Sequence, residues 1–454
     1  MIPATSFKGK TVALFGLGGS GRATARALIE GGASVLAWDD NPDSVANAES
    51  DGVPVGDLRQ ADWHRFASFV LSPGVPLTHP KPHWSVELAH GAGVEIIGDV
   101  ELFCRERRFF PGDVPFIAIT GTNGKSTTTA LAAHIIAASG RDAQMGGNIG
   151  RAVMTLDPVS AKRFYVVECS SYQIDLSPSL DPTAGILLNI TPDHLDRYAD
   201  FPAYAAAKAR LFAMQRADQH AVFGVGDLET FSIAKREAAR RAVDRIHRVT
   251  GEELIGLQPD WPSLQGPHNL QNAAAAIAVV EALGVTREQW RAAMPTFRGL
   301  PHRMERVAEV NGVLFINDSK ATNPASAAPA LAAFPPRTGA SGPQKRIHWI
   351  VGGLPKGEDL DDCAPWFGNV AAAYTIGDAG PLFADLLAPH MPVRRSEMMC
   401  EAIREAIAAA QPGEIVMLSP ACASFDQFRD YEARGDNFRQ IVEALTNPDG
   451  EAPC

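Results

Sequence analysis

The chain has 454 residues, of which 46% are apolar and 20% are charged, so it is long enough to form two to four domains with cores of their own. Lys and Arg number 41 against 52 Asp and Glu, a formal net charge of -11, and the basic residues are scattered. This distribution argues against a nucleic-acid-binding protein and points to small-molecule partners. Six cysteines without CxxC pairs favour reduced thiols over disulfides or zinc. The sequence shows neither a signal-peptide layout nor a membrane-spanning apolar run, so we expect a cytoplasmic enzyme that does not bind a membrane.

Short apolar runs alternate with alanine-rich segments along the chain, which predicts βαβ units with parallel sheets. The expected strands fall into three groups: 11–16, 34–39, 69–74 and 94–99; then 115–120, 163–168 and 184–191; then 312–318, 348–353, 372–377 and 414–420. Turn-rich segments separate the groups. We therefore predict a three-domain α/β protein with a Rossmann-like domain at 1–105, a central P-loop-type ATPase domain at 106–299 and a second Rossmann-like domain at 300–454.

The first expected strand runs into a glycine-rich turn, GLGGSG, that opens a helix. Gly16, Gly18 and Gly21 fit the pattern G-x-G-x-x-G, and Asp39 ends the next strand. This pattern is typical of a dinucleotide site, so an oxidoreductase or a binding-only protein is one interpretation. No later motif resembles a hydride-transfer site. The loop itself predicts a cradle for a diphosphate at the start of a helix and leaves the nucleoside open.

A second phosphate loop, TGTNGKST, follows the strand at 115–120. Gly121, Gly124, Lys125 and Ser126 form a variant of the common P-loop, whose first glycine would fall at Ile119. Backbone N–H groups at a helix start, together with a lysine, suit a polyphosphate, and a hydroxyl of Ser126 or Thr127 suits Mg²⁺. A glycine turn without a ligand is the alternative structural interpretation, and the loop by itself is equally compatible with a kinase.

This loop forms a series with the segments GGNIG, ECSSYQ, NITPDHLDRY, YAAAKARLF, GPHNLQNAAAA, GLPHRME, NDSKATNP and SPACASFDQF. The series resembles the Mur ligases and their folylpolyglutamate synthetase relatives over nearly the whole chain. Within the family, NDSKATN, GLPHR and SPACASFDQF resemble the members that add D-glutamate to UDP-N-acetylmuramoyl-L-alanine. The resemblance implies a monomeric ATP-dependent amide ligase of peptidoglycan precursor synthesis that forms an acyl phosphate and releases ADP and phosphate. A folylpolyglutamate-type ligase is the nearest alternative.

The metal and catalytic residues are implied by the same resemblance. Glu168 ends a strand and His194 follows one, so each is also compatible with an ordinary surface or structural role. Lys208 lies among alanines, and helix propensity alone favours a solvated lysine there. The resemblance instead makes it a lysine carbamylated by CO₂, which becomes an oxygen ligand for Mg²⁺. Two Mg²⁺ sites are expected, one of them bridged by this carbamate. The implied metal ligands are Ser126, Glu168, His194 and Lys208, and the implied catalytic residues are Lys125, Glu168, His194, Lys208 and Arg303.

The nucleotide contacts divide between the two loops. The ATP site is expected to comprise Gly121, Thr122, Asn123, Gly124, Lys125, Ser126, Thr127, Asn269, Asn272, Arg303 and Asp318. In this set the two asparagines either approach the adenine or cap a helix. Asp318 is expected to reach a ribose hydroxyl. Arg303, beside His302, closes onto the γ-phosphate or forms an interdomain salt bridge. The UDP-linked acceptor is expected at Gly18, Gly19, Ser20, Asp39, Ser72, Gly74, Asn148, Gln173 and His194.

The amino-acid substrate needs groups that hold its carboxylates. The resemblance places D-glutamate at Thr322, Lys356, Ser424 and Phe425, with Tyr431 beside them, and Lys320 is a further donor in NDSKATN. Lysine and backbone N–H groups suit carboxylates. Lys356 is otherwise an ordinary loop lysine. The chain departs from the usual family residues at Gly19, Ser20, Asp40 and Asn41, which in relatives contact the uridine nucleotide.

Overall fold

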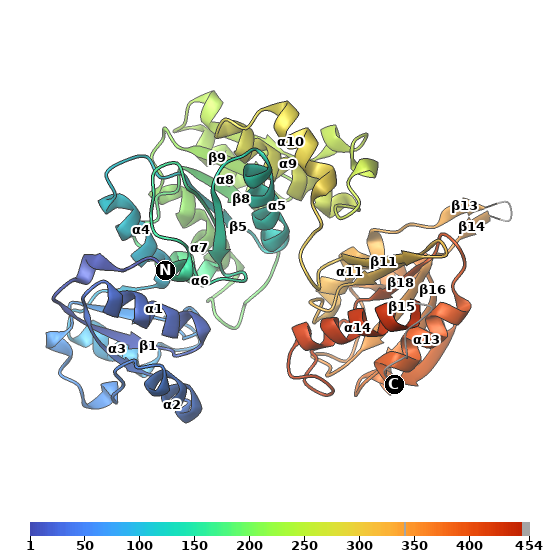
Figure 1. Cartoon of the computed structure of the whole chain (residues 1–454), viewed down its shortest axis with the longest axis horizontal. Coiled ribbons are helices and arrows are strands. Elements are labelled where there is room, and N and C mark those ends of the chain that lie inside the picture. Colours follow the sequence, from blue (N-terminus) through green and yellow to red (C-terminus); the bar gives the residue numbers. More distant parts are fainter. Residues whose placement is uncertain (340–341, 447–454) are drawn as a thin grey trace. The chain divides into compact units, whose positions relative to one another are not determined.

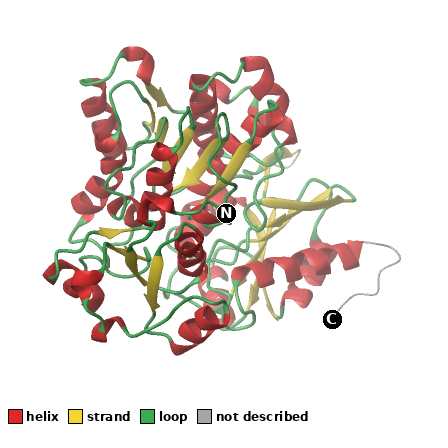
Figure 2. Ribbon diagram, turned by 60° about the vertical axis from the view of Figure 1, so that its left-hand side comes forward, coloured by secondary structure: helices red, strands yellow, loops and turns green. Residues whose placement is uncertain are grey.

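The computed structural model describes residues 1–339 and 342–446 and has a mixed α/β fold built on parallel sheets (Figures 1 and 2). By their contacts the residues form two compact units, Met1–Glu253 with Gln271–Met294, and Leu254–Leu270 with Pro295–Cys454. Cys454 lies outside the described residues. The expected parallel α/β class is confirmed. Among the described residues, no helix is both long and apolar enough to cross a membrane.

The first unit begins with a four-stranded parallel sheet in the order β2-β1-β3-β4. Its strands are β1 (Thr11–Phe15), β2 (Ser34–Trp38), β3 (Ser68–Leu71) and β4 (Ile96–Ile97). The helices are α1 (Gly19–Glu30), α2 (Pro42–Ser50), α3 (Trp84–Gly91) and α4 (Asp99–Phe109). The four strands occur where the sequence predicts them, although the fourth is reduced to two residues.

A six-stranded parallel sheet in the order β10-β9-β8-β5-β7-β6 completes the first unit. Its strands are β5 (Phe116–Thr120), β6 (Ala143–Gly147), β7 (Phe164–Glu168), β8 (Ala184–Leu187), β9 (His220–Gly224) and β10 (Ile246–Val249). The helices are α5 (Lys125–Ala138), α6 (Ser171–Asp175), α7 (Phe201–Met214), α8 (Leu228–Ala238), α9 (Pro267–Ala282) and α10 (Arg287–Ala293). The start of α9 belongs to the second unit.

The second unit is built on a sheet in the order β11-β12-β18-β15-β16-β17, in which only the β11–β12 pair is antiparallel. Its strands are β11 (Glu305–Val310), β12 (Val313–Asn317), β15 (Ile347–Gly352), β16 (Val370–Ile376), β17 (Val393–Glu397) and β18 (Ile415–Leu418). The helices are α11 (Pro324–Ala332), α12 (Gly380–Leu387), α13 (Met399–Ala409) and α14 (Tyr431–Thr446). A small antiparallel hairpin, β13 (Arg337–Gly339) with β14 (Gly342–Gln344), precedes β15.

The central strands are continuous apolar runs because helices cover both faces of each sheet. All five residues of β5 and β7 and all six of β15 are buried. In parallel sheets the carboxyl ends of the strands meet at one edge, which is where open α/β folds place ligands. Both glycine loops and Asp318 follow such strand ends and Glu168 is the last residue of β7, so the fold brings these predicted residues to the carboxyl edges of the sheets.

Candidate active site

The first glycine loop is closely packed against the end of β3. The hydroxyl of Ser72 donates a hydrogen bond to the Gly16 carbonyl oxygen at 2.9 Å. A Cβ at Gly16 would lie 2.5 Å from the Cβ of Ser72, and one at Gly21 would lie 1.7 Å from the Gly16 oxygen. Neither position tolerates a side chain. Helix α1 has no side-chain cap, so its first N–H groups are available to an anion.

Asp39 fixes the shape of this loop from the end of β2. Its carboxylate accepts hydrogen bonds from the backbone N–H of Leu17 at 2.6 Å and of Asn41 at 2.9 Å. A cavity of about 420 Å³ opens beside it and is lined by Trp38, Asp39, Asp40, Pro42, Val45, Ala46, Glu49 and Arg59. A cavity next to a diphosphate cradle is suitably placed for a nucleoside.

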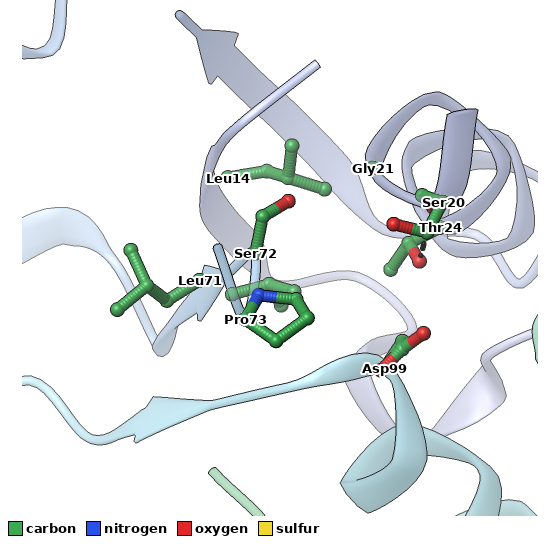
Figure 3. Close-up of a pocket in the computed structure, with 9 residues that line it drawn as sticks. Leu14, Ser20, Gly21, Thr24, Leu71, Ser72, Pro73 and Asp99 are labelled. Atoms are coloured by element: carbon green, nitrogen blue, oxygen red, sulfur yellow. Dashed lines mark hydrogen bonds between the residues drawn. The ribbon is translucent and has the colours of Figure 1, made fainter. Parts of the chain in front are cut away.

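A second, small pocket lies between the starts of α1 and α4. Figure 3 shows Ser20, Ser72 and Asp99 around this pocket. Asp99 is not among the residues predicted from the sequence. Its side chain is only 5% exposed, and burial raises its pKa. Its carboxyl accepts a hydrogen bond from the Gln173 side chain at 3.5 Å. This hydrogen bond connects the start of α4 to α6, the helix that follows β7.

The second phosphate loop starts α5, with Gly124 as the residue before the helix at φ 82°. A Cβ at Gly124 would lie 2.2 Å from the side-chain oxygen of Asn272, so this predicted residue is packed directly against the loop. The Lys125 ammonium donates to the carbonyl oxygens of Gly121 at 3.0 Å and Thr122 at 2.8 Å. Ser126 is buried at the start of the helix, and a hydroxyl at this position suits Mg²⁺ beside phosphates.

Lys208 is 2% exposed, so the solvated lysine favoured by helix propensity is wrong. Its ammonium donates to the Gly121 carbonyl oxygen at 2.8 Å and lies 4.8 Å from the ring centroid of Tyr204. Burial, reinforced by the positive charge of Lys125, lowers the Lys208 pKa well below its usual value. A neutral amine is the form that reacts with CO₂, so the environment suits carbamylation.

Glu168 is also buried, with an exposed fraction of 2%. The side-chain amide of Asn148 donates to its Oε1 at 2.9 Å, whereas Oε2 has no hydrogen-bond partner among the described residues. A buried carboxylate oxygen without a partner is costly unless a cation balances it. No group of three or more His, Cys, Asp and Glu side chains in 1–339 and 342–446 forms a metal cluster. Mg²⁺ at Glu168 therefore fits a site completed by other ligands, such as the Ser126 hydroxyl or a carbamate.

His194 follows β8 in a backbone conformation unusual for a non-glycine residue, at φ 55°. Its ring lies 5.2 Å from that of Tyr172 and 6.0 Å from that of Tyr204. Burial is the main cause of the lowered His194 pKa, and the positive charge of Lys125 also lowers it. The neutral imidazole favoured here can ligate a metal.

Two contacts of the phosphate loop escaped the sequence interpretation. The side-chain oxygen of Asn189 accepts a hydrogen bond from the Asn123 backbone N–H at 2.9 Å. The side-chain nitrogen of Asn189 donates to the Asn123 carbonyl oxygen at 3.1 Å. The Tyr204 hydroxyl lies 3.1 Å from the Thr122 hydroxyl. Tyr204 precedes Lys208 by one helical turn, so helical spacing would have placed the two side chains on one face.

In the second unit, Asp318 follows β12 and is 5% exposed. It accepts hydrogen bonds from the backbone N–H of Met304 at 3.1 Å and the hydroxyl of Ser419 at 2.8 Å, and burial raises its pKa to about 7. Asn269 and Arg303 belong to the same unit, whereas Asn272 belongs to the first. The side chain of Asn269 donates to the Gln265 carbonyl at 2.9 Å.

The residues expected to hold D-glutamate lie on loops that follow β12, β15 and β18. Leu354 and Ala423 exchange two backbone hydrogen bonds of 3.0 Å, which joins the Lys356 loop to the Ser424 loop. The Lys320 ammonium donates to the Tyr431 hydroxyl at 3.2 Å. Ser424 is buried, whereas Lys356 and Phe425 are exposed.

A buried arginine, which the sequence did not single out, supports these loops. The Arg434 guanidinium donates to the carbonyl oxygens of Ser319 at 2.8 Å, Ala423 at 3.0 Å and Cys422 at 3.0 Å. Thr322 follows on the same loop as Ser319, and its N–H donates to the Lys320 carbonyl at 2.9 Å. The fold thus gathers the predicted amino-acid-binding residues at one edge of the second unit's sheet.

Comparisons with known proteins identify the family of the chain. The Mur ligase middle domain matches residues 119–280, and the glutamate ligase domain of Mur ligases matches residues 302–422. Curated relatives named UDP-N-acetylmuramoylalanine--D-glutamate ligase include one from Novosphingobium aromaticivorans, 56% identical over 100% of this chain and 99% of its own. Another, from Brucella abortus, is 54% identical over 98% of each chain.

Solved structures share the fold at much lower identity. A UDP-N-acetylmuramate-alanine ligase from Thermotoga maritima aligns with a TM-score of 0.56 at 17% identity, covering 96% of this chain and 99% of its own. A pseudomurein peptide ligase type C from Methanothermus fervidus aligns with a TM-score of 0.52 at 16% identity, covering 96% and 100%. On the domain matches and the full-length relatives, the chain belongs to the Mur ligase family.

Proposed function

We propose that this chain is an ATP-dependent ligase that joins D-glutamate to UDP-N-acetylmuramoyl-L-alanine through an acyl phosphate and releases ADP and phosphate. The observation that carries the proposal is the presence of two separate glycine loops in one unit, at 16–21 and at 121–126, each of which starts a helix without a side-chain cap. We assign each loop to a phosphate-bearing substrate. A simple kinase or dehydrogenase needs one nucleotide site. An ATP-driven ligase with a nucleotide-linked acceptor needs two.

The proposal retains the predicted division into a Rossmann-like domain at 1–105, a P-loop-type ATPase domain at 106–299 and a second Rossmann-like domain at 300–454. In the first domain, Gly18, Gly19 and Ser20 hold the diphosphate of the acceptor with backbone N–H groups at the start of α1. The cavity beside Asp39 receives the nucleoside. Ser72, Gly74, Asn148, Gln173 and His194 complete the acceptor site.

In the central domain, the N–H groups at the start of α5 and the Lys125 ammonium neutralise the triphosphate of ATP. Mg²⁺ held by Ser126, Glu168, His194 and carbamylated Lys208 would supply the further charge neutralisation that lets a carboxylate approach a triphosphate. Oε2 of Glu168 has no hydrogen-bond partner among the described residues, which supports Glu168 as one of these ligands. Asn272 lies against the phosphate loop at Gly124. Asn269, Asp318 and Arg303 are assigned to the adenine, the ribose and the γ-phosphate.

The Lys208 carbamate forms by direct addition. The neutral Nζ attacks the carbon of CO₂, an N–C bond forms, and one proton leaves to solvent. The product carries a negative charge on two oxygens, so a cationic side chain becomes an anionic metal ligand. Burial and the neighbouring Lys125 favour the neutral amine from which this reaction starts.

The amide bond forms in two steps. The acceptor carboxylate takes the γ-phosphoryl group from ATP and becomes an acyl phosphate. The amine of D-glutamate then attacks the acyl carbon, and phosphate leaves as the tetrahedral intermediate collapses. Thr322, Lys356, Ser424 and Phe425, beside Tyr431, hold the amino acid. The chain's main task is to position the reactants and to neutralise their charge.

Phosphate release measured with purified protein tests the proposal. Phosphate and ADP should appear only when ATP, UDP-N-acetylmuramoyl-L-alanine and D-glutamate are all present, and L-glutamate should not replace the D-isomer. A stable phosphorylated product without amide formation would favour a kinase instead. Quenching or enhancement of NADH fluorescence would favour the dinucleotide interpretation of the first loop. That the chain works as a cytoplasmic monomer remains a prediction.

A further inference from the structure

Arg197 has no role in the assignments above, yet its side chain makes an unusual set of contacts. Its Nη1 donates to the Gly74 carbonyl oxygen at 2.9 Å, and its Nη2 donates to those of Val75 at 3.1 Å and Pro73 at 3.5 Å. One guanidinium therefore holds three successive carbonyls of the segment that follows β3. Only a planar group with several donors can do this, so lysine is not equivalent here.

The other side of Arg197 is fixed near the candidate reaction centre. Its guanidinium carbon lies 4.4 Å from the ring centroid of Tyr172, which stacks on Tyr198 at 5.8 Å and 11°. The Arg197 backbone N–H donates to the His194 carbonyl oxygen at 2.9 Å, which closes the turn that carries His194. Arg197 is thus held by an aromatic face and by the turn of a candidate metal ligand.

The segment that Arg197 holds is continuous with the diphosphate cradle. The Val75 N–H donates to the Ser72 carbonyl at 3.0 Å, and the Ser72 hydroxyl donates to the Gly16 carbonyl at 2.9 Å. Direct contacts therefore run from the glycine loop through Ser72 and residues 73–75 to Arg197 and His194. All of these residues belong to the first unit.

We propose that Arg197 is a positioning residue that couples the nucleotide end of the acceptor to the reaction centre at His194. Binding of the nucleoside diphosphate orders the glycine loop and Ser72, and Arg197 transmits that order to the turn that carries His194. Binding energy from a part of the substrate that does not react is thereby used to orient the part that does. This proposal rests on the proposed placement of the acceptor.

Two acceptors separate coupling from simple structural support. One is UDP-N-acetylmuramoyl-L-alanine, and the other is the same molecule cut back to the sugar 1-phosphate, which lacks UMP. Arg197→Ala should lower kcat/KM for the full acceptor by about 30-fold or more, since it removes several charged hydrogen bonds. With the truncated acceptor the loss should be about threefold or less, because little nucleotide binding remains to be transmitted. Arg197→Lys should recover only a small part of the activity.

Arg163→Ala is the matched control. The Arg163 guanidinium likewise donates to a backbone carbonyl, that of Pro158 at 2.7 Å, and it also donates to the Asp142 carboxylate at 2.6 Å. Arg163 lies just before the start of β7, whereas Glu168 lies at its end. This variant should change kcat/KM for both acceptors by less than about twofold. Should Arg197→Ala fail to fold, Tyr172→Leu removes the aromatic face beneath the guanidinium and should show the same preferential loss on the full acceptor.

The outcomes distinguish the two proposals. Equal losses on both acceptors, or no loss beyond that of Arg163→Ala, would overturn the role of Arg197 as a coupling residue. A wild-type protein that uses the truncated acceptor as efficiently as the full one would instead overturn the placement of the nucleotide in the first glycine loop. A wild-type preference for the full acceptor that Arg197→Ala abolishes supports both.

Discussion

Lys208 and Lys125 donate hydrogen bonds to the same atom, the carbonyl oxygen of Gly121, at 2.8 Å and 3.0 Å. Two ammonium groups held this close repel each other, and burial of Lys208 removes the water that would screen them. Both effects lower the Lys208 pKa, so the lysine on α7 favours the neutral amine.

Replacing Lys208 with alanine should lower kcat by at least about 100-fold, because the proposed carbamate ligand can no longer form. Wild-type activity should also fall in buffer freed of bicarbonate and return on its addition. Lys235→Ala, at an exposed position on α8, is the control and should behave as the wild type. A carbamate signal in ¹³C NMR with labelled bicarbonate should be present in the wild type and absent from Lys208→Ala. Full activity of Lys208→Ala would refute the carbamate.

The lowered pKa of Lys208 should also make the free energy of unfolding depend on pH. Its folded pKa lies well below the unfolded value, so the unfolded chain binds the extra proton in the pH range between the two values. The lysine therefore costs folding free energy that grows as the pH falls from the unfolded pKa towards the folded one. In bicarbonate-free urea titrations, Lys208→Met should be more stable than the wild type at pH 7, and the difference should shrink towards pH 10. A difference that grows with pH would contradict the buried neutral amine.

Gly124→Ala should weaken ATP binding. The new Cβ would lie 2.2 Å from the Asn272 side-chain oxygen at a backbone φ of 82°, so the Asn272 side chain or the loop must shift. We expect KM for ATP to rise about tenfold or more, with a smaller change in KM for D-glutamate. Gly256→Ala is the control, since nothing lies within 4 Å of a Cβ at that position. Equal increases in both KM values would indicate general damage to the fold.

Lys356→Ala should raise KM for D-glutamate far more than KM for ATP, by about tenfold or more, because it removes a positive charge that pairs with a carboxylate. The side chain is exposed, so the free energy of unfolding should change by less than about 0.5 kcal/mol. Lys345→Ala provides a matched exposed lysine before the start of β15, whereas Lys356 follows its end. Parallel changes in the two KM values would remove Lys356 from the amino-acid site.

Local sequence patterns were sufficient to place the two glycine loops, Glu168 and Asp318. Each lies at the end of an apolar strand, and the carboxyl ends of parallel strands meet at one edge whatever the rest of the fold does. The pattern could not reveal the burial of Lys208. Alanines surround it on α7, and alanine is a strong helix former that is compatible with an exposed helix face as well as with a packed one.

Contacts between distant segments were missed for a related reason. Arg197 touches carbonyls more than 120 residues earlier in the chain, and backbone carbonyls leave no mark in a sequence pattern. Arg434 likewise holds loops near Ser319 and Cys422 that only the assembled sheet brings within reach. Asp99 begins a helix, where an acidic residue is unremarkable until its burial is known.

The β13–β14 hairpin has a practical consequence. The hairpin leads into the start of β15 at Ile347, whereas Lys356 follows the end of the same strand. The hairpin therefore lies at the end of β15 opposite the candidate amino-acid site. Thr338 on this hairpin is exposed. A cysteine introduced there would carry a fluorescent dye away from the candidate amino-acid site, so labelling should leave turnover unchanged.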